Sequence, residues 1–167
     1  VTTKREMNDF VEFPETIYKD CPYYVPDLEM DVRNMFNPKK NAGLECSEIQ
    51  AFVAYDSNVH PVGRIAGIIN HRANEKWKTQ NVRFGFFDFV DDLEVSSALL
   101  EAVIQWGKER NTTSIQGPMG ITDFDKEGML VEDFDRLGSM NTYYNYAYYP
   151  QHMEALGYEK EVDWVQV

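Results

Sequence analysis

The spacing of hydrophobic residues predicts two helices at the start of the chain. Thr3-Lys4-Arg5-Glu6 is a capping-box sequence, in which the Thr side chain accepts from a backbone N–H of the first turn and the Glu side chain reaches back. We expect Pro14 to break or kink the helix that follows. A second helix is expected with Pro26 in its first turn, and its apolar face consists of Leu28, Val32 and Phe36.

From Ile49 onward the pattern changes to that of strands. Residues 49–55 and 62–70 are rich in β-forming residues and are separated by Asp56-Ser57-Asn58, which predicts a hairpin. Residues 82–90 predict a third strand. This strand has aromatic residues on both faces, so we expect it at the centre of the sheet. A short strand is expected at Ser114-Ile115-Gln116-Gly117.

The third strand leads directly into an amphipathic helix, whose apolar stripe is Val95, Ala98, Leu99, Ala102, Val103 and Trp106. This strand, helix and next strand predict a right-handed parallel crossover. A long connection from 118 to about 142 precedes a helix at 146–156, which ends at Gly157. Residues 158–167 alternate as a closing strand does.

This order of elements predicts an α/β (α+β) fold with a mixed, mostly antiparallel central sheet of about six strands flanked by helices. The 167 residues are enough for one domain, 1–167, with its own core. The chain does not begin with methionine and its strand pattern continues to Val167, so we expect a domain excised from a longer chain. An unpaired edge on the final strand would then recruit a second domain or a second copy.

Acidic residues outnumber basic ones, with 28 Asp+Glu against 16 Lys+Arg and a net charge of −12. No basic run offers a track for phosphates, which argues against nucleic acid and anionic membranes as partners. No apolar run approaches the roughly 20 residues of a membrane-spanning helix. The cysteines and histidines do not have the spacing of metal ligands or of a disulfide framework; they are Cys21, Cys46, His60, His71 and His152. We therefore expect free thiols, no metal site and a cytoplasmic location.

The element order, residues 91–103 and the segment Tyr148-Tyr149…Leu156-Gly157-Tyr158 resemble the GCN5-related N-acetyltransferase superfamily, which has the acyl-CoA N-acyltransferase fold. The resemblance covers nearly the whole chain. It implies transfer of an acyl group from acetyl-CoA or another acyl-CoA to an amine. Within the superfamily the chain is similar to a group of bacterial proteins with sequences such as Pro61-Val62-Gly63-Arg64-Ile65-Ala66, Gly85-Phe86-Phe87 and Gly117-Pro118-Met119.

The pyrophosphate-binding turn of that family, Q/R-x-x-G-x-G/A, corresponds here to an acidic sequence. Asp91, Glu94 and Ser96 stand at its three defining positions, and only the small Ser96 is close to the pattern. Carboxylates repel a diphosphate at the place where glycines would admit it. The resemblance implies cofactor contacts at Phe89, Val90, Val95, Ser96 and Ser97.

Two residues match the proton-transfer positions of the family. The resemblance implies that Asp88 is the general base for the amine and that Tyr149 is the acid for the departing thiolate. Asp88 has a plainer interpretation as a strand-end carboxylate that caps the next helix or lies exposed. Tyr149 belongs to an aromatic cluster of a kind that more often packs with satisfied hydroxyls, together with Tyr143, Tyr144, Tyr146 and Tyr148.

Arg64 is the basic residue of an otherwise apolar strand, and it could hold a substrate carboxylate or pair with Asp or Glu on an exposed face of the sheet. The connection 118–142 mixes apolar and acidic residues, which fits either a lid over a pocket for a cationic amine or a loop packed back on the sheet. The substrate-binding candidates are Arg64, Met119, Phe124 and Tyr144.

The resemblance and the acidic turn leave two functions open. The first is an acyl-CoA-dependent N-acyltransferase that acts on a small amine. The second, favoured by the acidic turn, is a degenerate, non-catalytic member of the fold that acts as a ligand-binding or interaction module.

Overall fold

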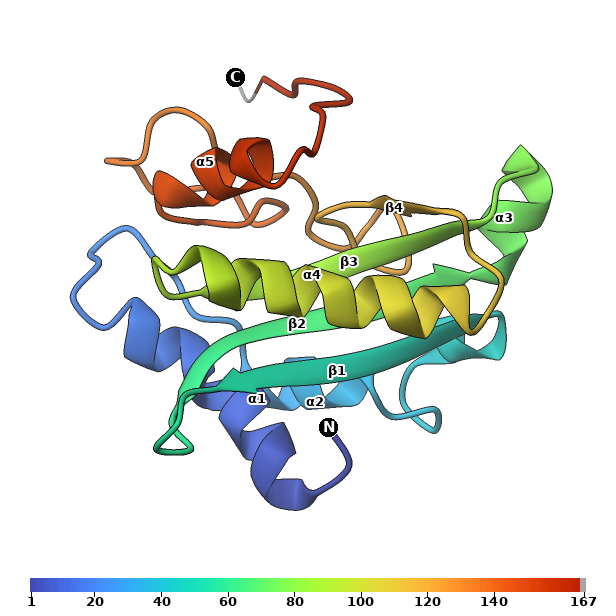
Figure 1. Ribbon diagram of the computed structural model, residues 1–167, viewed down its shortest axis with the longest axis horizontal. Helices are drawn as coiled ribbons and strands as arrows, with labels where there is room; N and C mark the ends of the chain where they lie inside the picture. The colour runs from blue at the N-terminus through green and yellow to red at the C-terminus, as the bar shows by residue number, and fades with distance from the viewer. Residues whose placement is uncertain (166–167) are drawn as a thin grey trace.

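The computed structural model describes residues 1–165, and a four-stranded sheet lies at its centre (Figure 1). The strand order is β1-β2-β3-β4, with antiparallel pairing from β1 to β3 and parallel pairing of β4 with β3. The mixed, mostly antiparallel sheet and the parallel crossover are confirmed, whereas the sheet in the described residues has four strands instead of about six. The strands are β1 (Ser47–Tyr55), β2 (Pro61–Asn70), β3 (Asn81–Phe89) and β4 (Ser114–Gln116).

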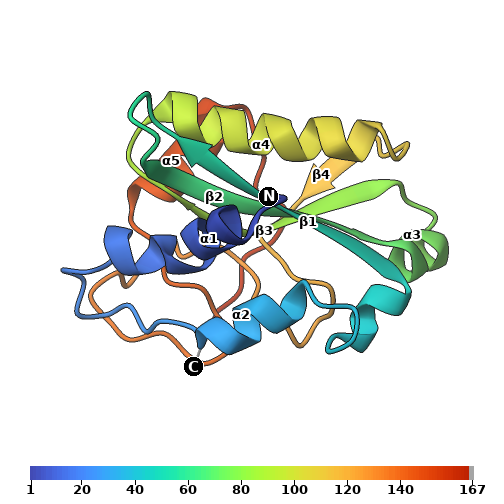
Figure 2. The same cartoon turned by 90° about the horizontal axis from the view of Figure 1, so that it is seen from below.

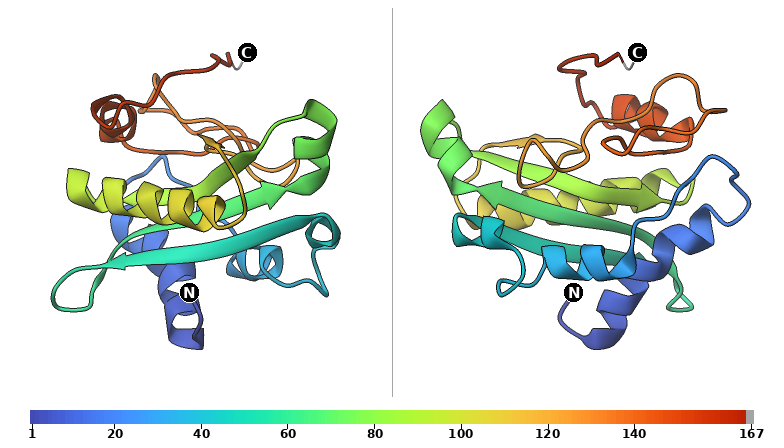
Figure 3. Two further views of the ribbon diagram at one scale, coloured as in Figure 1. Left: turned by 45° about the vertical axis from the view of Figure 1, so that its right-hand side comes forward. Right: turned by 180° about the vertical axis from the view of Figure 1, so that it is seen from behind.

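Helices cover both faces of the sheet. The long helix α4 (Leu93–Lys108) crosses one face, and α1 (Lys4–Ile17) and α2 (Glu29–Met35) lie on the other (Figure 2). The short helix α5 (Tyr148–Ala155) and the connection that precedes it lie beside the β3 and β4 edge (Figure 3). At the far end of the hairpin, α3 (His71–Trp77) joins β2 to β3.

Two apolar clusters hold these layers together, and each fully buried large side chain contributes on the order of 1.5 to 3 kcal/mol. Between α4 and the sheet, the buried residues include Leu99, Leu100, Val103, Ile65, Phe84 and Phe89. Between α1, α2 and the sheet, they are Phe10, Val11, Val32, Ala51, Ala66 and Phe86.

The start of α1 follows the predicted capping box, because Thr3 accepts from the Glu6 N–H and the Glu6 side chain accepts in return. Pro14 does not break this helix, which continues to Ile17. The second helix begins after Leu28, so Pro26 lies before it and not in its first turn.

Asparagine side chains cap two short helices that the hydrophobic pattern does not predict. Asn70 accepts from the Ala73 N–H and starts α3 directly at the end of β2. Asn41 accepts from the Gly43 N–H at the start of the 3₁₀ helix η1 (Ala42–Glu45). The four residues of η1 are too few to carry a hydrophobic stripe, and α3 consists mostly of polar residues, which explains why periodicity misses them.

The C-terminal segment differs most from expectation. The helix at its start is confirmed as α5, and Gly157 follows it with a positive φ of 82°. Residues 158–165 form no strand, so the predicted closing strand is wrong there; Gln166 and Val167 lie outside the described residues. The neighbouring edge strand β4 has only three residues, which is too short an edge to pair with a ten-residue strand. The edge expected to recruit a second domain or copy is therefore not formed by 158–165.

Candidate functional site

A β-bulge in β3 decides where Asp88 points. Arg64 pairs with Asp88 and Ala66 pairs with Gly85, so Phe86 and Phe87 together oppose one residue of β2. Phe86 has a positive φ of 49°. Because side chains alternate along a strand, this extra residue moves Asp88 from the α4 face to the α1 face of the sheet, opposite Arg64.

Arg64 and Asp88 form a buried ion pair. Arg64 Nε lies 2.9 Å from Asp88 Oδ2, and the two residues are 3% and 8% exposed. Arg64 also lies over the Phe10 ring, with its guanidinium carbon 5.1 Å from the ring centroid. The prediction that Arg64 pairs with an acidic residue is confirmed. The prediction that this pair lies on an exposed face of the sheet is wrong, because both residues are buried. Asp88 is likewise neither exposed nor a helix cap.

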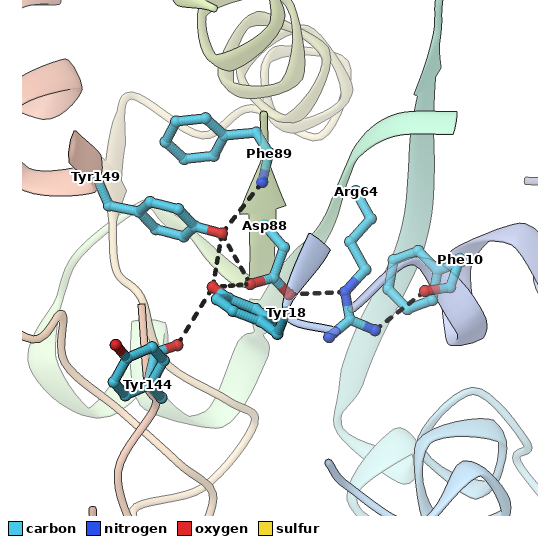
Figure 4. Close-up of polar contacts among 7 residues, drawn as sticks. All are labelled: Phe10, Tyr18, Arg64, Asp88, Phe89, Tyr144 and Tyr149. Atoms are coloured by element: carbon cyan, nitrogen blue, oxygen red, sulfur yellow. Dashed lines mark hydrogen bonds and ion pairs between the residues drawn. The ribbon is translucent and has the colours of Figure 1, made fainter. Parts of the chain in front are cut away.

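Two tyrosine hydroxyls complete the surroundings of Asp88 (Figure 4). Tyr18, from the end of α1, donates to Asp88 Oδ1 at 2.9 Å and lies 2.7 Å from the Tyr149 hydroxyl. Tyr149, from α5, donates to the same Asp88 oxygen at 3.1 Å. Four segments that are distant in the sequence therefore meet at one carboxylate.

The protonation of these tyrosines follows from burial. Loss of solvent, and then the negative charge of Asp88, raise the pKa of both Tyr18 and Tyr149 well above the ordinary tyrosine value. Both hydroxyls therefore keep their protons at neutral pH and act as hydrogen-bond donors. The side chains are almost fully buried, as the packing interpretation of the tyrosine cluster expects.

The backbone groups of Phe89, which the resemblance expects to contact the cofactor, already form hydrogen bonds with side chains of α5. The Phe89 N–H donates to the Tyr149 hydroxyl at 3.3 Å, and the Phe89 carbonyl accepts from the Tyr148 hydroxyl at 2.5 Å. The Val90 N–H donates to the Val62 carbonyl. In this conformation, the main-chain N–H groups of Phe89 and Val90 and the Phe89 carbonyl pair within the protein.

The acidic turn before α4 has internal partners as well. Asp91 Oδ1 lies 2.7 Å from His152 Nε2, and His152 Nδ1 lies 2.8 Å from the Ser96 hydroxyl. Asp92 caps α4 by accepting from the Glu94 N–H. Two of the three carboxylates in this turn thus have a nearby donor, and Glu94 lies exposed in the first helical turn.

The remaining cofactor candidates lie in the first turns of α4. Ser96 is fully buried and its hydroxyl also donates to the Leu93 carbonyl at 3.1 Å. Val95 packs against the apolar cluster between α4 and the sheet, and Ser97 is partly buried. These residues lie together with His152 at the end of β3, where the resemblance expects the cofactor.

The substrate candidates do not converge on one point. Phe124 is 97% exposed, whereas the Met119 N–H donates to the Phe84 carbonyl where the chain leaves β4. The Tyr144 hydroxyl donates to the Phe134 carbonyl at 2.9 Å, and its own carbonyl accepts weakly from Tyr18. The guanidinium of Arg64 is used within the buried network, so it does not present a free surface for a substrate carboxylate.

None of the helices in residues 1–165 has the length and apolar character needed to cross a membrane. The same residues contain no cluster of three or more His, Cys, Asp or Glu side chains arranged to hold a metal ion.

Two residues of the site are not identified from the sequence. Tyr18 could be assigned only to an apolar helix face, and His152 shares no ligand spacing with the other histidines. No spacing rule joins positions 18, 88 and 149, or positions 91, 96 and 152, because the tertiary structure brings them together.

Comparison with known proteins gives two relatives and a solved structure of the same fold, and no family model matches the chain. Protein YghO of Escherichia coli is 32% identical over 167 residues, which are 98% of this chain and 42% of YghO. The bacterial ceramide synthase of Caulobacter vibrioides is 26% identical over 164 residues, again 98% of this chain and 42% of the relative. The chain therefore spans about two-fifths of the length of these curated relatives.

A Pyrococcus furiosus protein provisionally described as an acetyl transferase superimposes with a TM-score of 0.53 at 13% identity, over 98% of this chain and 94% of that one. At this identity the match concerns the fold. The chain has the acyl-CoA N-acyltransferase fold of the GCN5-related acetyltransferases, as the resemblance implied.

Proposed function

We propose that the chain is the acyl-transfer domain of an acyl-CoA-dependent N-acyltransferase whose acceptor is a long-chain amine. The observation that carries this proposal is the opening of the sheet beside Asp88. β4 pairs with β3 only from Asn81 to Arg83, and the remaining edge of β3 leads to Asp88 and Tyr149. An acyl donor that lies along this edge would bring its thioester to a carboxylate and a phenol 3.1 Å apart.

The acceptor class is supported by the Caulobacter relative. A ceramide is the amide of a fatty acid with a long-chain amino alcohol, so a ceramide synthase name suggests acylation of a long-chain amine. The net charge of −12 favours a cationic amine over an anionic acceptor.

The chemistry uses Asp88 and Tyr149 as a pair. The acceptor reacts as the neutral amine, after its ammonium proton has passed to solvent. The amine nitrogen forms a bond to the thioester carbonyl carbon, and the carbon–sulfur bond breaks. Asp88 takes the proton that the nitrogen loses, and Tyr149 gives its proton to the sulfur. Their hydrogen bond then returns the proton from Asp88 to Tyr149, so that both residues regain their starting forms. Arg64 supplies the counter-charge that a buried carboxylate requires.

The acidic turn fits an acyl-CoA better than its sequence suggests. All three carboxylates of the turn are exposed, but His152 lies against Asp91 and Asp92 accepts from the Glu94 N–H, so two of them have donors within the protein. Ser96 supplies the small residue that the turn requires, and the first turn of α4 offers its N-terminal dipole to phosphate.

The second candidate function is a non-catalytic binding module. It is favoured by one observation, namely that Tyr148 and Tyr149 already occupy the Phe89 backbone groups. Calorimetry with coenzyme A and palmitoyl-CoA separates the two functions. Micromolar affinity, about −8 kcal/mol, supports the transferase, whereas no binding up to about millimolar ligand excludes it for this chain.

A turnover assay tests the acceptor. We expect amide formation from palmitoyl-CoA and sphinganine, detected by mass spectrometry, with little product from a short amine such as ethanolamine. Tyr149→Phe should lower kcat with little change in acyl-CoA affinity. An unchanged kcat in this variant would remove Tyr149 from the proposed mechanism.

A further inference from the structure

Tyrosine side chains form hydrogen bonds with the backbone at the outer edge of β3, where no strand pairs with it. After β4 departs, the Phe84 carbonyl accepts from the Met119 N–H. At the end of the strand, the Phe89 N–H and carbonyl pair with the hydroxyls of Tyr149 and Tyr148. An edge strand normally offers such groups to another extended chain, so these two hydroxyls hold a position that a ligand with amide groups would use.

The helix that carries both tyrosines is attached to the rest of the domain through few elements. α5 has eight residues, and the segments on either side of it, 117–147 and 156–165, contain no helix or strand. It is held through the buried Tyr149, which stacks on Phe89 with 4.3 Å between ring centroids and contacts Asp88 and Tyr18, and through His152, which contacts Asp91 and Ser96. Tyr148 and Met153 also pack against the core. A short element bounded by irregular segments can open while the sheet stays intact.

We propose that Tyr148 and Tyr149 form a latch on Phe89, and that this tyrosine latch opens when an acyl-CoA binds along β3. This inference rests on the proposed function and adds a resting state to it. In the closed latch, Tyr149 donates to Asp88 and accepts from the Phe89 N–H, so its proton is not directed at a substrate. Opening the latch breaks the contacts of Tyr148 and Tyr149 with Phe89 and leaves the contact between Tyr149 and Asp88 that the proposed mechanism uses, so donor binding at the Phe89 backbone and access to the acid are coupled.

Tyr148→Phe tests the latch without altering the proposed acid. The variant removes the bond to the Phe89 carbonyl and shifts α5 toward the open state, which raises the fraction of protein able to bind. We expect palmitoyl-CoA to bind about fivefold more tightly, the equivalent of one ordinary hydrogen bond. Tyr146→Phe is the matched control, because its hydroxyl donates to the Ile17 carbonyl and not to β3.

Hydrogen exchange gives a second measurement. Palmitoyl-CoA should increase amide exchange in residues 148–155 of the wild-type chain, and Tyr148→Phe without ligand should show the same increase. Equal affinity and equal exchange in wild type, Tyr148→Phe and Tyr146→Phe would overturn the latch and leave the transferase proposal standing. Binding by none of the three would overturn the proposed function, and with it the latch as a device of that site.

Discussion

Arg64 donates through Nη1 to the carbonyl oxygen of Phe10, 3.0 Å away. In a regular helix that carbonyl accepts from the N–H four residues later, but residue 14 is a proline and has none. The same guanidinium donates through Nε to Asp88. One side chain therefore satisfies the carbonyl that Pro14 leaves free and ties α1 to β3, which explains why the helix continues past its proline.

Asp88→Asn should destabilise the domain strongly. The change leaves the buried Arg64 guanidinium without its counter-charge, and loss of one partner in a buried pair costs about 3 to 5 kcal/mol. Urea unfolding followed by circular dichroism measures this free energy. Glu29→Gln, which breaks the exposed pair with Arg33, is the control and should change stability little. Equal effects in the two variants would contradict the structural role of the Arg64–Asp88 pair.

His152 should be energetically coupled to Asp91. A double-mutant cycle with His152→Gln and Asp91→Asn is expected to give a coupling of about 0.5 to 1 kcal/mol in unfolding free energy, a modest value because Asp91 is largely exposed. Glu29→Gln replaces Asp91→Asn in a control cycle, since Glu29 lies on α2 across the sheet, and should give no coupling. Additive effects in the first cycle would show that this contact does not hold α5.

The stability of the domain should fall at alkaline pH. Burial and the Asp88 charge raise the pKa of Tyr18 and Tyr149, and burial raises the pKa of several other tyrosines, so the folded state retains protons that the unfolded chain releases above about pH 10. The stabilisation is complete below that pH and is lost as the pH rises toward the folded-state pKa values. Each tyrosine contributes a loss of about 1.4 kcal/mol per pH unit.

Urea unfolding at about pH 9 and about pH 11 measures this slope, and Tyr149→Phe should make it shallower because one of the groups with a raised pKa is removed. The same slope in the variant and in the wild type would mean that Tyr149 titrates normally in the folded state.

Gly85→Ala should displace the start of the long connection. A Cβ at Gly85 would lie 2.6 Å from the carbonyl oxygen of Met119, which is backbone and cannot move aside as a side chain can. We expect a loss of about 1 to 3 kcal/mol in unfolding free energy. Gly138→Ala is the control, because its Cβ would meet only the Thr142 side chain, at 3.1 Å. Similar stability in the two variants would contradict this close crossing.

Much of the fold could be predicted from local patterns. The hairpin of β1 and β2, the strand β3 and the helix α4 match their hydrophobic periodicity, and the Thr3 capping box starts α1 as its sequence indicates. These features depend on neighbours a few residues apart in the chain, which is the range over which sequence patterns carry information.

The arrangement of the site depends on contacts that no local pattern contains. Alternation along β3 would direct Asp88 at α4, and the bulge at Phe86 and Phe87 turns it toward Arg64 and Tyr18 instead. Alternation at 158–167 predicts a closing strand, but a strand requires a partner edge, and β4 ends after three residues. Residue pattern thus predicted the elements, while the pairing register and the packing of α1 and α5 decided which side chains surround Asp88, because burial and hydrogen-bond partners exist only once distant segments meet.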